Sequence, residues 1–62
     1  MNTYTNPETG EYTNSTKTKD ILALGQAGDV LNVKHEVNGQ VYYHEMQIVR
    51  NRYGKLDLAG LS

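Results

Sequence analysis

The fold is decided by residues 29–50, which read DVLNVKHEVNGQVYYHEMQIVR and carry Asn38-Gly39 at their centre. The two flanking segments, 29–37 and 40–50, are rich in Val, Ile and Tyr, which are residue types enriched in β-strands. Asn-Gly favours a two-residue type I′ turn because both residues tolerate a positive φ. The stretch therefore predicts an antiparallel β-hairpin with its turn at residues 38–39.

The register of this hairpin sorts its side chains onto two faces. Val37 opposes Gln40, and residues two apart along a strand share a face. We expect one face to form the core, and it carries Leu31, Val33, His35, Val37, Tyr42, His44, Met46 and Ile48. The opposite face is expected to be mostly solvated, and it carries Val30, Asn32, Lys34, Glu36, Val41, Tyr43, Glu45, Gln47 and Val49.

A third strand is predicted over residues 55–59. It follows Asn51-Arg52-Tyr53-Gly54, in which Gly54 is suited to a turn in the left-handed region. Pairing Asn51 with Lys55 brings Leu56 opposite Arg50 and Leu58 opposite Ile48, both on the core side. The segment from residue 29 onward therefore predicts a three-stranded antiparallel meander, and we expect its buried side chains to include Val33, Met46, Ile48 and Leu56.

The residues before the meander predict a second hairpin and a short helix. Residues 3–5 and 11–13 flank NPETG, where Pro presets φ and Gly accepts a positive φ; the alternative is a disordered tail, because this part has few aliphatic side chains. Residues 18–27 favour a helix with Thr18 as its N-cap and Gly28 just past its end.

The expected fold is therefore α+β and mostly β: an N-terminal β-hairpin, one short helix, then the antiparallel meander. Residues 1–62 form one small domain, since a chain of 62 residues is too short for two. Within it, residues 1–17 are the hairpin arm and residues 18–62 are the helix plus β-meander.

Composition narrows the function classes. The chain has no cysteine, which excludes disulfides and thiolate zinc sites and fits a reducing compartment. There is no basic start followed by an apolar stretch, and the longest apolar run, residues 21–24, is far too short to cross a membrane. We expect a soluble, cytoplasmic protein. Six Lys and Arg against seven Asp and Glu give a net charge of −1, which provides no general attraction to nucleic acid.

The predicted fold does not bring metal-ligating or nucleophilic side chains together into a site. His35 and His44 share the core face, but a stable metal site needs three or four ligands. Glu36 and Glu45 point to the opposite face because strand side chains alternate. Neither serine is predicted to lie beside a base that would activate it as a nucleophile. We expect no catalytic residues, no metal and no cofactor.

Binding chemistry is better represented than catalysis. Cations and aromatic rings gather near the predicted third strand and on the outer face, and the candidate partner-binding residues are Lys34, Tyr43, Arg50, Arg52, Tyr53 and Lys55. Such groups stack on bases and contact phosphates, or anchor a protein interface; the alternative is a solvated hairpin tip. Five tyrosines in a chain without Phe or Trp favour the protein interface, because Tyr combines apolar area with a polar group.

The leading hypothesis is a small non-catalytic module that binds and modulates a partner protein, as accessory or inhibitor proteins of phages and plasmids do. One alternative is a nucleic-acid-binding module that uses these Arg, Tyr and Lys residues. Another is a homo-oligomeric structural subunit.

Overall fold

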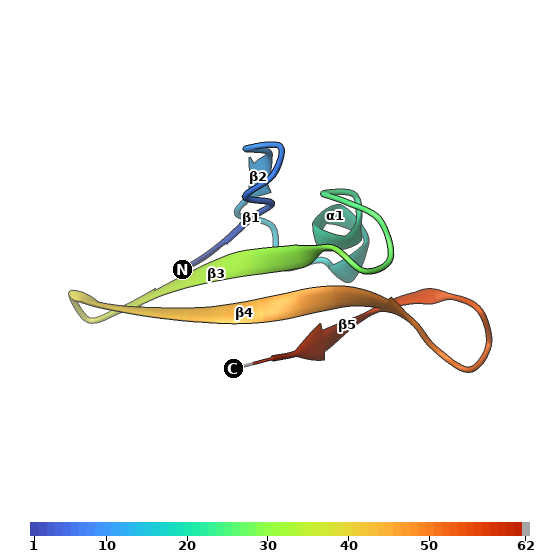
Figure 1. The fold of residues 1–62 in the computed structure, drawn as a ribbon. Coiled ribbons are helices and arrows are strands. Elements are labelled where there is room, and N and C mark those ends of the chain that lie inside the picture. The colour runs from blue at the N-terminus through green and yellow to red at the C-terminus, as the bar shows by residue number, and fades with distance from the viewer. Residues whose placement is uncertain (62) are drawn as a thin grey trace.

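The computed structural model describes residues 1–61 and is mostly β (Figure 1). Its elements are β1 (Asn2–Thr5), β2 (Tyr12–Thr13), α1 (Thr18–Leu22), β3 (Val30–Val37), β4 (Gln40–Arg50) and β5 (Leu56–Gly60). Within the described residues, the strands form one antiparallel sheet in the order β2-β1-β3-β4-β5. The predicted fold class, with an N-terminal hairpin, one short helix and a meander, is confirmed.

The central hairpin has the predicted turn and register. Asn38 and Gly39 both have a positive φ, at 51° and 78°. Val37 pairs with Gln40, and the ladder continues in this register along β3 and β4. Figure 1 shows these two long strands side by side, with the turn at one end of the molecule.

Replacing Gly39 with Val is expected to lower the free energy of unfolding by about 1–3 kcal/mol, because a β-branched residue is strained at positive φ. A Cβ at this position would meet nothing within 4 Å, so the cost comes from the backbone rather than from a clash. Gly60→Val is the matched control: Gly60 lies in β5, has equally open space and does not have a positive φ. Urea denaturation followed by circular dichroism measures both. Equal losses would contradict the assigned turn.

The last strand also pairs as predicted. The backbone N–H of Asn51 donates to the carbonyl of Lys55 at 2.8 Å, and Gly54 has a φ of 77°. Leu58 lies opposite Ile48 in the β4–β5 ladder, and Leu56 lies opposite Arg50. The turn residues therefore set the register of β5.

The N-terminal arm is joined to the meander through strand pairing. β1 lies antiparallel to β3, with Thr3 opposite Lys34 and Thr5 opposite Asn32. The two segments that the sequence predicts separately thus form one sheet, and β1 becomes an inner strand of that sheet.

The helix begins differently from the prediction. Its N-cap is Lys17 rather than Thr18, and no side chain caps it. Ser15 orders the approach to the helix instead: its hydroxyl accepts the N–H of Lys17 at 3.1 Å and donates to the carboxylate of Asp20 at 2.6 Å. Ser15, three residues before Thr18, therefore stabilises the start of the helix, and the side chain of the N-cap residue does not.

The helix is also shorter than predicted, ending at Leu22 rather than near residue 27. The chain then packs closely at Gly25, where an added Cβ would lie 2.5 Å from the Asp29 carboxylate. That carboxylate accepts the N–H of Gln26 at 2.8 Å and so stabilises the non-helical path. In the described part of the chain, no helix is both long and apolar enough to cross a membrane.

The core occupies only part of the face that the sequence assigns to it. Its buried apolar side chains, contributed by α1 and its flank, β3 and β4, are Ile21, Leu24, Leu31, Val33 and Ile48. The prediction is wrong for Val37, Tyr42 and His44, which are exposed, and for Leu56, which is 36% exposed; Met46 is partly buried. The five-residue α1 is too short to cover the whole sheet, and Figure 1 shows it nearer the β4–β5 turn than the 38–39 turn.

Candidate binding surfaces

Residues 37–44 form a projecting end of the β3–β4 hairpin, which we call the distal hairpin. On one side, pairing of β3 with the N-terminal strand ends where the N–H of Glu36 donates to the carbonyl of Met1 at 3.0 Å. On the other side, Leu61 donates to the carbonyl of Glu45 at 3.0 Å. Among the residues that the structure describes, the distal hairpin has no strand partner beyond these two points.

The distal hairpin collects exposed apolar side chains. Val37 and Val41 are 41% and 44% exposed, and Tyr42 and Tyr43 are 52% and 75% exposed. These are four of the nine large apolar residues found exposed in the described chain. The segment reads VNGQVYYH and has no Asp, Glu, Lys or Arg. Uncharged surface with clustered aromatic and aliphatic groups is typical of the centre of a protein interface.

Backbone groups of β4 are directed at an open edge in this region. The N–H of Ile48 donates to Asp29, toward the β3 side, at 2.9 Å. Backbone groups of successive strand residues point to alternate edges, which agrees with the bond from Leu61 to Glu45 on the β5 side. By the same alternation, the N–H and C=O of Val41 and Tyr43 point to the β5 side, beyond the end of β5.

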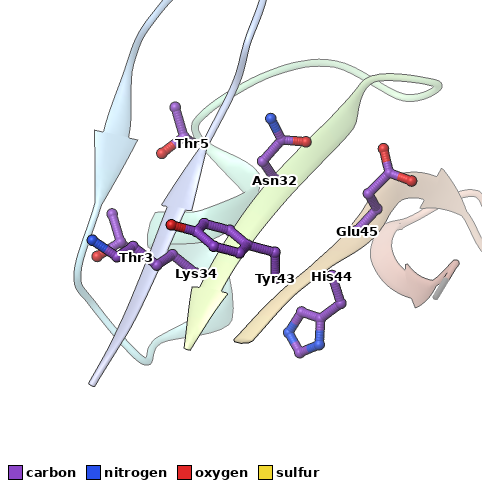
Figure 2. Close-up of a pocket in the computed structure, with 7 residues that line it drawn as sticks. All are labelled: Thr3, Thr5, Asn32, Lys34, Tyr43, His44 and Glu45. Atoms are coloured by element: carbon purple, nitrogen blue, oxygen red, sulfur yellow. The ribbon is translucent and has the colours of Figure 1, made fainter. Parts of the chain in front are cut away.

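The sheet face opposite α1, here called the outer face, carries an open depression beside the distal hairpin. It measures about 600 Å³ and is lined by Thr3, Thr5, Asn32, Lys34, Tyr43, His44 and Glu45. Figure 2 shows the ring of Tyr43 lying across β3 toward β1, whereas the imidazole of His44 points away from that ring. Tyr43 is thus the large side chain that dominates this depression.

The charge of Lys34 is already paired. Its Nζ lies 3.2 Å from a carboxylate oxygen of Glu36, and both side chains are about half exposed. The pKa of Lys34 is raised, first by the hydrogen bond to Glu36 and then by the negative charge of that carboxylate. Lys34 therefore stays protonated at physiological pH, but its partner offsets the positive charge that it would present to a ligand.

The remaining candidate residues lie at the β4–β5 turn, residues 50–55, which we call the basic turn. The guanidinium of Arg52 sits 5.1 Å from the centre of the Tyr53 ring, and Tyr53 is 72% exposed. Lys34 and Tyr43 oppose each other in the sheet, but Tyr43 is seven residues along β4 from Arg50. Seven extended residues span about 23 Å. The six predicted residues therefore form two separate surfaces.

The histidines have separate environments. Nδ1 of His35 is hydrogen-bonded to Oδ1 of Asn2, and the ring lies 6.5 Å from that of Tyr42. His44 is exposed at the margin of the outer depression. In residues 1–61, no three or more His, Asp, Glu or Cys side chains are grouped so that they could hold a metal ion.

Five of the seven residues that line the outer depression are not among the sequence-predicted candidates, and two of these five, Thr3 and Thr5, come from β1. They reach it because β1 pairs with β3. In the sequence, Thr3 and Thr5 are two residues apart in an extended segment, which predicts that they share one face of the sheet. This spacing does not predict which strand the segment pairs with.

Comparison of the chain with protein-family models, curated proteins and solved structures finds no match. The function is therefore inferred from the surfaces described above.

Proposed function

We propose that the protein is a non-catalytic binding module that modulates a partner protein through the distal hairpin. The observation that supports this proposal is the concentration of four exposed apolar side chains in eight uncharged residues. Burying such surface against a partner removes apolar area from water, which is the main favourable term in protein association. As an accessory or inhibitor protein, of the kind that phages and plasmids encode, the protein would act on a larger assembly.

The proposed occupant is an extended segment of the partner protein, added as a strand beside β4. Open strand edges are templates for such pairing, and no proline or charged residue protects residues 40–44. Main-chain bonds to Val41 and Tyr43 supply affinity, and side-chain contacts supply specificity. Tyr42 lies on the α1 side while Val41 and Tyr43 lie on the outer face, so a segment with apolar residues on both faces fits best.

The charges near this surface support a protein rather than a nucleic acid as its partner. The distal hairpin contributes no cation, and the nearby Lys34 is paired with Glu36. Nucleic-acid affinity depends on cations that neutralise phosphates. A surface without free cations, in a chain of net charge −1, is poorly suited to that task.

A photo-crosslinking amino acid at position 40, which is exposed in the distal hairpin and leaves Tyr43 in place, tests the proposal when it is introduced in the cells of origin. We expect one dominant covalent protein product from this position and none from the exposed control position Thr16. Products containing only nucleic acid, or the same products from both positions, would contradict the proposal.

With the captured partner purified, Tyr43→Ala is expected to weaken binding about 30-fold or more, equivalent to about 2 kcal/mol, because an exposed aromatic anchor is lost. Isothermal titration calorimetry measures this loss. Tyr12→Ala is the matched control, since Tyr12 is 67% exposed but lies in β2 at the far edge of the sheet. Equal losses in the two variants would refute the assigned surface.

Hydrogen exchange tests the mode of binding separately. The amides of Val41 and Tyr43 are expected to exchange rapidly in the free protein and to become protected in the complex. Unchanged exchange at both amides, in a complex that Tyr43→Ala still weakens, would rule out strand addition while keeping the interface.

A further inference from the structure

The basic turn concentrates half of the chain's Lys and Arg residues within six positions. It contains Arg50, Arg52 and Lys55, which are three of the six cations, and no acidic residue. The remaining chain holds three cations together with all seven acidic residues. Within residues 1–61 none of the turn cations forms an ion pair with a carboxylate, while Lys34 does. The turn therefore presents unneutralised charge to the solvent.

The turn is held in one conformation by hydrogen bonds that converge on Asn51. Oδ1 of Asn51 accepts the N–H groups of Tyr53 and Lys55, at 2.9 and 3.1 Å. The backbone of Asn51 accepts from Gly54 at 2.9 Å and donates to Lys55 at 2.8 Å. A ligand that binds here does not have to order the loop first, and preorganisation of this kind favours affinity.

The two guanidinium groups are also positioned. Nη1 of Arg50 donates to the carbonyl of Gly54 at 2.9 Å, and Arg52 lies over the ring of Tyr53. A guanidinium has five N–H donors, so one internal bond or a stacked face leaves others for a ligand. Carboxylates are well suited to accept from them, because charge-assisted bonds to Arg are among the strongest in proteins.

We infer that the basic turn is a second docking site, which binds a carboxylate-rich segment of a protein. Charge complementarity identifies the occupant: a short acidic segment contacts three cations without extending over the acid-rich remainder of the chain. A long nucleic acid would be repelled by that remainder. Figure 1 shows the β4–β5 turn at the opposite end of the molecule from the 38–39 turn, so this site does not depend on the distal hairpin.

Fluorescence anisotropy of a labelled hexaglutamate peptide with the full chain, at low salt, tests the inference. Arg52→Glu and Lys55→Glu are each expected to weaken binding about tenfold or more, as expected when a charge-assisted hydrogen bond is lost. Lys19→Glu is the control, because it makes the same charge change on α1; we expect it to weaken binding about twofold at most. If one of the two turn variants, Arg52→Glu or Lys55→Glu, does not fold, the other still tests the inference.

Three results would overturn the inference: no binding of hexaglutamate to the wild-type chain, an equal loss in Lys19→Glu, or tighter binding of a charge-matched single-stranded oligonucleotide. The last result would favour nucleic acid as the ligand of the turn. Tyr43→Ala is expected to leave hexaglutamate binding unchanged. Failure here therefore leaves the proposed role of the distal hairpin intact, and failure of that role leaves the basic turn intact.

Discussion

Replacing Ile48 with Ala is expected to lower the free energy of unfolding by about 2–5 kcal/mol. Ile48 is fully buried and belongs to the cluster that joins α1 to β3 and β4. A domain of this size has only a few kcal/mol of stability from its core, so the variant should be largely unfolded at 37 °C. Circular dichroism during thermal and urea denaturation measures the loss.

Leu56→Ala is the control for this prediction. Leu56 lies in the neighbouring strand and is 36% exposed, so its truncation removes less buried apolar area. We expect a loss of about 1 kcal/mol or less. Ile48→Val provides a graded variant, with an expected loss of about 0.5–1.5 kcal/mol. If Leu56→Ala were as destabilising as Ile48→Ala, the described limits of the core would be wrong.

The meander could be predicted from sequence because its register depends on local turn chemistry. Asn38 and Gly39 take the positive φ values that a two-residue turn requires, and this fixes every pair between β3 and β4. Gly54 does the same for β5. Once these turns form, the two-residue period of side chains assigns each residue to a face without further information.

The pairing of β1 with β3 could not be predicted in the same way. No tight turn joins these strands; the second half of the arm, α1 and the loop before β3 lie between them. The alternation of Thr3 and Thr5 is compatible with several partners and registers. For this reason the β1 side of the outer depression was missed, although Lys34 and Tyr43, from β3 and β4, were predicted.

The alternation of side chains along a strand predicts which face of the sheet a residue occupies. It does not predict how much of that face the helix α1 covers. β4 has 11 residues, whereas α1 has five and ends at Leu22. Val37 and Tyr42 share a face with the buried Leu31 and Ile48, yet they lie beyond the reach of the helix. The difference in length between the sheet and α1 leaves Val37 and Tyr42 exposed, so this error in the predicted core adds two apolar side chains to the proposed interface, beside Val41 and Tyr43 of the outer face.

Asn6→Ala is expected to lower the free energy of unfolding by about 1.5–4.5 kcal/mol. Asn6 is only 2% exposed, and its Nδ2 donates to the carbonyl of Leu24 at 2.9 Å, while its Oδ1 accepts the N–H of Glu8 at 3.0 Å. Alanine would leave the Leu24 carbonyl without this donor, at about 1–3 kcal/mol, and would remove the second bond at about 0.5–1.5 kcal/mol. Urea denaturation measures the total.

Asn14→Ala is the matched control, since the Asn14 amide donates to Oγ1 of Thr3 at 2.8 Å but the residue is exposed. Water replaces an exposed bond, so the loss should stay below about 1 kcal/mol. Asn6→Asp keeps the acceptor for Glu8 and puts an oxygen opposite the Leu24 carbonyl; we expect it to be at least as destabilising as Asn6→Ala at neutral pH. If Asn6→Asp retained wild-type stability, the bond to Leu24 would contribute nothing, and the arm would be held to the body by its other contacts, among them the β1–β3 ladder and the hydrogen bond between Asn2 and His35.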